Sequence, residues 1–145
     1  MDVFIEELIM SVIKSKRGES QVQFLQTARD LLRYTKIQCM KFPKRYTFFG
    51  NQQMCNCAYR MLENIKKGNS TYPRNNHEVQ IRRDYFMEAL SELQVLAEYI
   101  DDARNTFPIK DTVMVEWLRL LTDEIKLIRA LIKKDTERYK DVFKD

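Results

Sequence analysis

The sequence predicts an all-α protein, an antiparallel up-down four-helix bundle with a short extra helix at its N-terminus. Glycine and proline number only three each in 145 residues, well below the average usage of about 7% and 5%. A turn-rich β architecture is therefore a poor fit. Apolar residues recur at intervals of three and four through four long segments, which is the spacing of one helix face. No segment alternates as a half-buried strand would.

The N-terminal segment is short and amphipathic. We expect residues 1–16 to form a separate helix, because apolar residues recur there at helical spacing. Residues 17–20 are interpreted as a linker that contains Gly18, and Ser20 is placed to cap the following helix. Residues 21–145 are then predicted to form a single four-helix bundle domain.

Proline and glycine mark the limits of the first two bundle helices. The first is expected from about Gln21 to Lys41, with a polar gap in its apolar stripe around Thr35, and Pro43 ends it. The second is expected from near Thr47 to about Lys67. Gly68 supplies the C-terminal stop.

The last two helices follow the clearest loop of the chain, the polar segment 68–77. The third helix is expected from about Glu78 to Asn105, and Pro108 interrupts the pattern. Asp111 or Thr112 caps the fourth helix. Its apolar stripe is wider than a coiled-coil seam, so this helix is expected to bury more than one face.

The net charge of +4 conceals a strong asymmetry along the chain. Residues 33–83 carry eleven cations against two acids, a net charge of +9, whereas residues 1–32 and 84–145 are net acidic. This polarity predicts binding to polyanions, or association of the basic part with the acidic part. The basic stretch could form a single basic end or face. The expected phosphate contacts are Lys41, Lys44, Arg45, Arg60, Lys66, Lys67, Arg74, Arg82 and Arg83.

Aromatic residues are interleaved with these cations. Exposed aromatic rings can stack on single-stranded bases next to phosphate contacts. We nevertheless interpret Phe42, Phe48 and Phe49 as residues that pack the end of the bundle, the more common use of aromatic residues near a turn.

The sequence shows no pattern typical of a catalytic, metal or cofactor site, and none is predicted. The single histidine, His77, lies in the polar loop. Neither the Glu-x-x-His pairs of metal-binding bundles nor a zinc ligand set can be assembled from it. Arg74 and His77 resemble the Arg/His element of small helical RNases, but only two residues separate them. A solvated loop is the favoured interpretation.

The cysteines indicate a reducing compartment. Cys39, Cys55 and Cys57 are odd in number, and we interpret them as buried structural thiols of a cytoplasmic protein. The longest apolar run is far shorter than the roughly 20 residues that a bilayer span needs. No membrane partner is therefore expected.

Several motifs resemble a family of small bacterial four-helix-bundle proteins. This family comprises the accessory variability determinants of diversity-generating retroelements and the 23S rRNA intervening-sequence proteins. The resemblance covers roughly residues 22–140. The matching residues are the run Tyr34–Tyr46 with its Phe42-Pro43-Lys44 corner, Leu62-Glu63-Asn64-Ile65 with Lys67, Arg82-Arg83-x-Tyr85, Trp117, and Asp135-x-x-Arg138-Tyr139.

The resemblance implies a non-enzymatic accessory subunit. Such a protein would form a homopentameric, barrel-like assembly, associate with a reverse transcriptase and with RNA or DNA, and support mutagenic copying of a template into a variable gene. The alternative function is a structural or interaction protein that self-assembles and has no nucleic-acid role of its own. A helical RNase that acts through His77 is a third.

Overall fold

In the computed structural model, the described residues are 19–143, and they form four long helices and one short 3₁₀ helix. The elements are α2 (Glu19–Lys41), η1 (Lys44–Thr47), α3 (Asn51–Ser70), α4 (Asn76–Thr106) and α5 (Asp111–Arg138). No strand occurs among these residues, so the predicted all-α class is confirmed. The helix expected over residues 1–16 lies outside the described residues.

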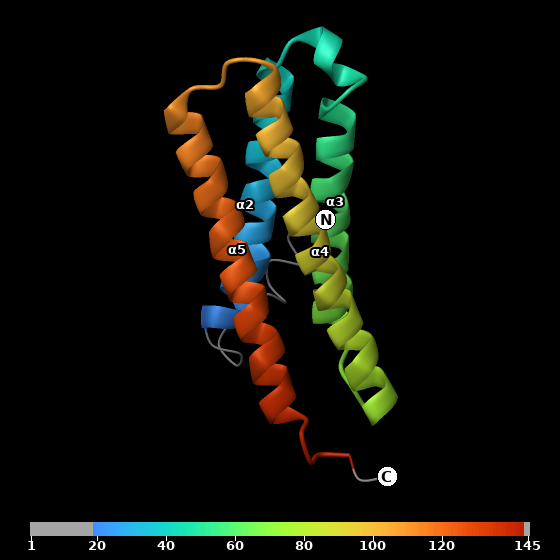
Figure 1. Ribbon diagram of the computed structural model, residues 1–145. Helices are drawn as coiled ribbons and strands as arrows, with labels where there is room; N and C mark the ends of the chain where they lie inside the picture. The colour runs from blue at the N-terminus through green and yellow to red at the C-terminus, as the bar shows by residue number, and fades with distance from the viewer. Residues whose placement is uncertain (1–18, 144–145) are drawn as a thin grey trace, which may run out of the picture.

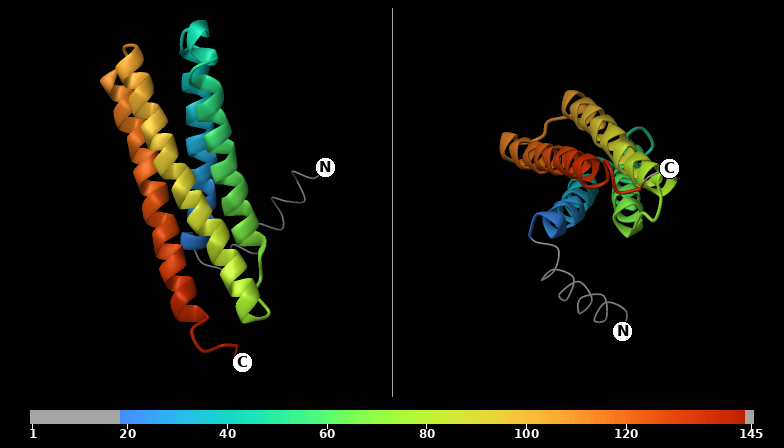
Figure 2. Two further views of the ribbon diagram at one scale, coloured as in Figure 1. Left: turned by 45° about the vertical axis from the view of Figure 1, so that its right-hand side comes forward. Right: turned by 90° about the horizontal axis from the view of Figure 1, so that it is seen from below.

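The four helices pack side by side around a common core. Helix α2 contacts α3 and α5, and α4 contacts the same two helices. Successive helices run in opposite directions along the bundle (Figure 1), and the view along the bundle in Figure 2 shows the four arranged around its axis. One end, here called the η1 end, holds η1 and the loop from α4 to α5. The other, the α3–α4 end, holds the loop from α3 to α4 and the last turn of α5.

The observed helix limits differ from the predicted ones at two starts. Helix α2 already includes Glu19 and Ser20, so Ser20 is not its N-cap and the predicted linker 17–20 is wrong in its second half. Serine is only mildly unfavourable inside a helix. The second bundle helix begins at Asn51 rather than near Thr47, because residues 44–47 form a tighter turn that buries Tyr46.

Gly68 does not stop α3, which continues to Ser70. A Cβ at this position would come within 2.6 Å of the Phe86 ring. Gly68 therefore permits α3 and α4 to approach closely near their connection, a packing role rather than the C-terminal stop that the sequence suggested.

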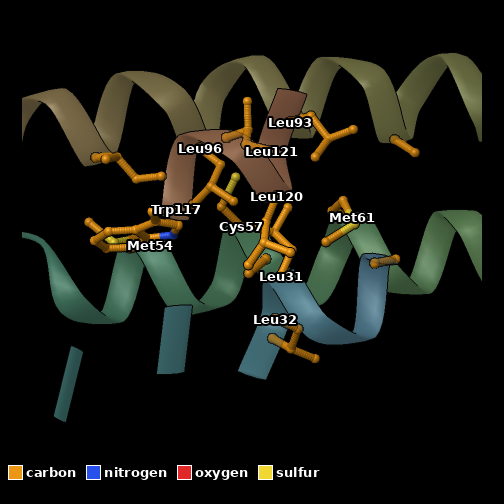
Figure 3. Packing of buried hydrophobic residues seen from close by; sticks show 14 of the residues in the cluster. Leu31, Leu32, Met54, Cys57, Met61, Leu93, Leu96, Trp117, Leu120 and Leu121 are labelled. Atoms are coloured by element: carbon orange, nitrogen blue, oxygen red, sulfur yellow. The ribbon is translucent and has the colours of Figure 1, made fainter. Parts of the chain in front are cut away.

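Large apolar side chains from all four helices fill the core (Figure 3), among them Leu31, Met61, Leu93 and Trp117. The polar gap around Thr35 lies inside this core. The Trp117 indole Nε1 donates to Thr35 Oγ1 at 3.0 Å, and the Thr35 hydroxyl donates to the Leu31 carbonyl oxygen at 2.8 Å. Thr35, the polar residue in this gap, therefore supplies the hydrogen-bond acceptor that the buried Trp117 indole N–H needs.

Glu124 on α5 is also buried, with no exposed surface. Neither of its carboxylate oxygens has a hydrogen-bond partner within residues 19–143. Burial disfavours the charged form, and it raises the pKa of Glu124 to about 9. Near neutral pH this side chain is therefore a protonated acid in the core.

Candidate nucleic-acid interface

The predicted phosphate contacts are divided between the two ends of the bundle. Lys41, Lys44 and Arg45 lie at the η1 end, where α2 finishes and η1 follows. Arg60 lies midway along α3. The remaining cations, Lys66, Lys67, Arg74, Arg82 and Arg83, lie at the α3–α4 end. Most of the 20-residue helix α3 separates the two groups, a distance of about 20 Å or more along the bundle. The basic stretch therefore does not form a single end.

Arg82 is a structural residue of the α3–α4 end. Only 5% of it is exposed, and its Nε donates to Asp135 Oδ2 at 2.6 Å. Its Nη1 donates to the carbonyl oxygens of Gly68 and Thr71 at 3.0 and 3.1 Å. The guanidinium lies over the Phe86 ring, 5.0 Å from its centroid. Arg82 thus holds α5, α4 and the end of α3 together and is not available as a phosphate contact.

Two other predicted contacts form ion pairs nearer the surface. Arg60 Nε lies 3.2 Å from Glu92 Oε1 of α4. Arg74 Nε lies 3.4 Å from Glu78 Oε1, and its backbone N–H donates to the same oxygen. The hydrogen bonds from Arg74 lower the pKa of Glu78. The two arginine side chains are 48% and 85% exposed, whereas those of Glu92 and Glu78 are 14% and 24% exposed. A phosphate contact at either arginine therefore comes at the loss of a partly buried ion pair.

The cations of the η1 end have no such partners. Lys41, Lys44 and Arg45 are exposed, and none of them forms a salt bridge within residues 19–143. Their charge is therefore free to attract an anion. This group was predicted by the sequence. Lys66, Lys67 and Arg83 at the other end are likewise exposed and form no salt bridge within residues 19–143.

A buried tyrosine fixes the backbone of the η1 end. The Tyr46 ring packs edge-on against Phe42 and Phe107, with centroids 6.2 and 4.9 Å away. Its hydroxyl donates to Asp102 Oδ2 at 2.9 Å, and burial, with this hydrogen bond, raises the pKa of Tyr46 to about 12. A Cβ at Gly50 would collide with the Tyr46 ring. Only glycine therefore lets the chain turn into α3 so close to this anchor.

Phe48 and Phe49 project from this anchored turn into solvent. They are 83% and 79% exposed, and Figure 1 shows their segment extending beyond the helix ends. The interpretation of all three phenylalanines as end packing is therefore wrong for these two and right for Phe42, whose ring contacts Tyr46, Phe107 and Trp117. The spacing in the sequence could not distinguish these three phenylalanines, because packing against the buried Tyr46 decides which of their rings lies in the core.

These five exposed residues all lie within positions 41–49, where α2 ends and η1 follows, and we call them the basic-aromatic end. Its members are Lys41, Lys44, Arg45, Phe48 and Phe49. It combines cations with two neighbouring aromatic rings on a turn whose backbone Tyr46 and Gly50 restrain. Such a surface can hold an anionic, ring-bearing ligand with little ordering on binding.

The α3–α4 end has a small cavity instead. It has a volume of about 180 Å³, lies between the start of α4 and the end of α5, and has Arg83 and Lys140 among its lining residues. Asp135, which also lines it, is already paired with Arg82. This end therefore presents a pocket with two cations, and at its rim the Tyr139 ring stacks on Phe143 with the centroids 6.3 Å apart.

The part of the chain that the structure describes shows little that is typical of a metal site, a histidine-dependent active site or a membrane span. Within residues 19–143, no group of three or more His, Cys, Asp or Glu side chains is placed to hold a metal ion. His77 is exposed. Among the described helices, none is both long and apolar enough to cross a bilayer.

Comparison with known proteins gives no relative from which a role could be transferred. No protein-family model, curated protein or solved structure matches the chain. What the fold and surface define is thus a four-helix bundle with a basic-aromatic end.

Proposed function

We propose that the protein is a non-enzymatic accessory subunit that binds single-stranded nucleic acid at its basic-aromatic end. The observation that carries the proposal is the exposure of Phe48 and Phe49 on the same turn as the exposed Lys44 and Arg45, a few residues further along the chain. Two large apolar rings in water are unfavourable unless a partner covers them. Flanking cations indicate that this partner is anionic.

The chemistry of the surface favours a single strand over a duplex. Unpaired bases expose flat faces that stack on aromatic rings, and each stacked base contributes about 1–3 kcal/mol. In a duplex those faces are covered by neighbouring base pairs. The lysines and the arginine supply the phosphate contacts, which carry no sequence information. Binding is therefore expected to depend weakly on sequence.

The wider role follows from the resemblance. We propose that the chain works beside a retroelement reverse transcriptase during mutagenic copying, as an antiparallel up-down bundle within a homopentameric assembly in the bacterial cytoplasm. The asymmetric charge and the unpaired cations of the η1 end support a nucleic-acid partner. Co-purification of the full chain with the reverse transcriptase encoded beside it would test the protein partner.

The binding surface is tested by titrating a labelled single-stranded RNA, a single-stranded DNA and a duplex DNA against the full chain at several salt concentrations. We expect the single strands to bind more tightly than the duplex, with affinity that falls steeply as salt rises. The variant Phe48→Ala/Phe49→Ala should weaken single-strand binding about tenfold or more.

The control variant removes two positive charges from α5, outside the basic-aromatic end. Lys126→Gln/Arg129→Gln changes two exposed cations in the middle of α5, away from the η1 end, and should leave the affinity almost unchanged. Absence of single-strand binding at about 50 mM salt, where electrostatic binding is strong, would refute the proposal. Equal losses in both double variants would place binding elsewhere on the protein.

A second candidate, a self-assembling scaffold with no nucleic-acid role, is favoured by exposed apolar residues on α5. Val115 and Leu118 are 68% and 38% exposed and lie three residues apart, so they share one helix face. Light scattering on Val115→Ser/Leu118→Ser tests it. A reduced mass with unchanged RNA affinity would assign this face to assembly and leave the basic-aromatic end as a separate site.

A further inference from the structure

The cavity at the α3–α4 end has walls from two helices that are far apart in the sequence. On α4 it is lined by residues of one helix face, among them Val79, Arg83 and Phe86. On α5 and just after it, the lining includes Ile132 and Lys140. Figure 1 shows the start of α4 and the end of α5 at the same end of the bundle. The basic-aromatic end lies at the opposite end, so the function proposed above does not use this cavity.

Two contacts hold the walls of the cavity together. Arg82 Nε donates to Asp135 Oδ2 at 2.6 Å, and Asp135 also lines the cavity. The Asn76 side-chain amide, in the first turn of α4, donates to the backbone carbonyl oxygen of Phe143 at 3.0 Å. The chain that follows α5 is therefore connected to the start of α4. A cavity with restrained walls loses little conformational freedom when a ligand enters it.

Part of the lining is apolar and is formed by Val79, Phe86 and Ile132. Phe86 is fully buried, and its ring packs edge-on against Phe24 with the centroids 6.1 Å apart. The volume of the cavity is about 180 Å³, and an apolar cavity of about 150 Å³ is large enough to hold benzene. The cavity therefore has room for one six-membered ring with a small substituent.

The charge of the lining is positive. Arg83 and Lys140 are exposed, and neither forms a salt bridge within residues 19–143. Asp135, an acid in the lining, is compensated by Arg82 at 2.6 Å and by Arg138 at 4.0 Å. Two uncompensated cations therefore lie beside an apolar surface. This combination favours a ligand that is part apolar and part anionic.

We propose that this cavity binds a small amphipathic carboxylate, whose apolar part is one six-membered ring or a branched aliphatic group of similar size. The apolar part lies against Val79, Phe86 and Ile132, and Arg83 and Lys140 bind the carboxylate. The planar guanidinium of Arg83 matches the two carboxylate oxygens. A nucleotide, with its base, sugar and phosphate, is larger than this volume. The proposal is therefore independent of nucleic-acid binding, and it assigns Arg83 a different anion from the phosphate that the sequence predicted.

The test titrates the full chain with benzoate and follows the backbone amide resonances by two-dimensional NMR. Benzamide has the same ring without the charge, and inorganic phosphate is an anion without a ring. We expect benzoate to bind with a dissociation constant of about 1 mM or lower and to shift the resonances of the lining residues Val79, Arg83 and Tyr139. Benzamide and phosphate should each bind at least about tenfold more weakly.

Two variants with the same change of charge locate the carboxylate. Arg83→Gln/Lys140→Gln should weaken benzoate binding about tenfold or more, and benzamide binding should not change. Lys126→Gln/Arg129→Gln is the matched control, because it removes one lysine and one arginine from exposed positions of α5 outside the lining. The control should leave both affinities unchanged. All four positions are exposed, so both variants are expected to fold.

A third variant fills the apolar part of the cavity. Val79→Phe places a ring where the ring of the ligand is proposed to lie, and it should abolish benzoate binding while the circular dichroism of the helices is retained. If this variant folds poorly, the two charge variants decide the outcome.

Three results would overturn the proposal. They are the absence of saturable benzoate binding well above the expected dissociation constant, equal affinities for benzoate and benzamide, and equal losses in the two charge variants. Displacement of benzoate by single-stranded RNA would also overturn it, because the cavity would then belong to the nucleic-acid surface. Failure of the chain to bind nucleic acid would leave the proposal intact.

Discussion

At the η1 end, Lys44 and Arg45 extend into solvent beside two exposed phenylalanines, whereas at the α3–α4 end Arg82 is buried against Asp135. Both groups belong to the same basic stretch of sequence. At the η1 end, the buried side chain is that of Tyr46, and Lys44 and Arg45 are exposed to solvent. At the other end, an arginine is itself part of the packing between three helices. The number of cations in a sequence therefore overestimates the number of phosphate contacts wherever one of those cations stabilises the packing between helices.

The largest effect is expected at the α3–α4 end, where Arg82 is buried. Arg82→Met leaves the buried Asp135 carboxylate with only its longer ion pair to Arg138 Nη1, 4.0 Å away, and we expect a loss of about 3 kcal/mol in the free energy of unfolding, the lower end of the range for a broken buried pair. Urea denaturation measures it. The neighbouring exposed Arg83→Met should change stability by less than about 0.5 kcal/mol.

A second substitution distinguishes the unpaired charge from lost packing. Arg82→Met/Asp135→Leu removes both charges, and it should recover most of the stability, because hydrophobic replacements of a buried pair are often neutral. If the double variant is as unstable as Arg82→Met, the arginine acts through its contacts to Gly68 and Thr71 instead.

A similar or smaller effect is expected at Glu124, which is buried like Arg82 but has no partner among the described residues. Its pKa rises from 4.5 to about 9 on folding. Between these values the folded state keeps a proton that the unfolded state releases, so stability falls as pH rises through this window. At pH 7 the loss relative to a neutral side chain is about 3 kcal/mol. Glu124→Leu should recover it.

The check compares unfolding free energies at about pH 5 and pH 8 for the native sequence, Glu124→Gln and the exposed control Glu137→Gln. The native sequence and the control should lose stability as the pH rises, and Glu124→Gln should lose less. Identical pH dependence in all three would mean that Glu124 acquires a partner or a water molecule in solution.

The smallest effect is expected when the two ends of the bundle are compared as nucleic-acid binding surfaces. Lys44→Gln/Arg45→Gln removes two proposed phosphate contacts, and the salt dependence of single-strand binding should decrease by about 1.4 in log–log slope. Lys66→Gln/Lys67→Gln makes the same charge change at the α3–α4 end and should lower the slope much less. Equal decreases would mean that nucleic acid follows the whole length of the bundle.

Much of the fold could be predicted from the sequence. The spacing of apolar residues and the scarcity of glycine and proline led to four helices, and the predicted limits agree best where a turn is strongly encoded, as at the start of α5. The starts of α2 and α3 were less predictable. A serine can cap or continue a helix with little difference in free energy, and burial of Tyr46 decides the turn before Asn51.

The candidate site was only partly predictable. Lys41, Lys44 and Arg45 are exposed as expected, whereas Arg82 is not. Asp135 was part of the resemblance, but nothing in the spacing shows that it lies 53 positions away from its partner in sequence and 2.6 Å away in space.

The sequence by itself determined the all-helical class, most helix positions and the uneven distribution of charge, because these depend on local periodicity and composition. Only the tertiary structure decided which members of the basic stretch reach solvent and which phenylalanines pack. Those outcomes depend on the rotation and height of each helix against its neighbours. Close packing of the whole core sets these two quantities, and no single segment encodes them.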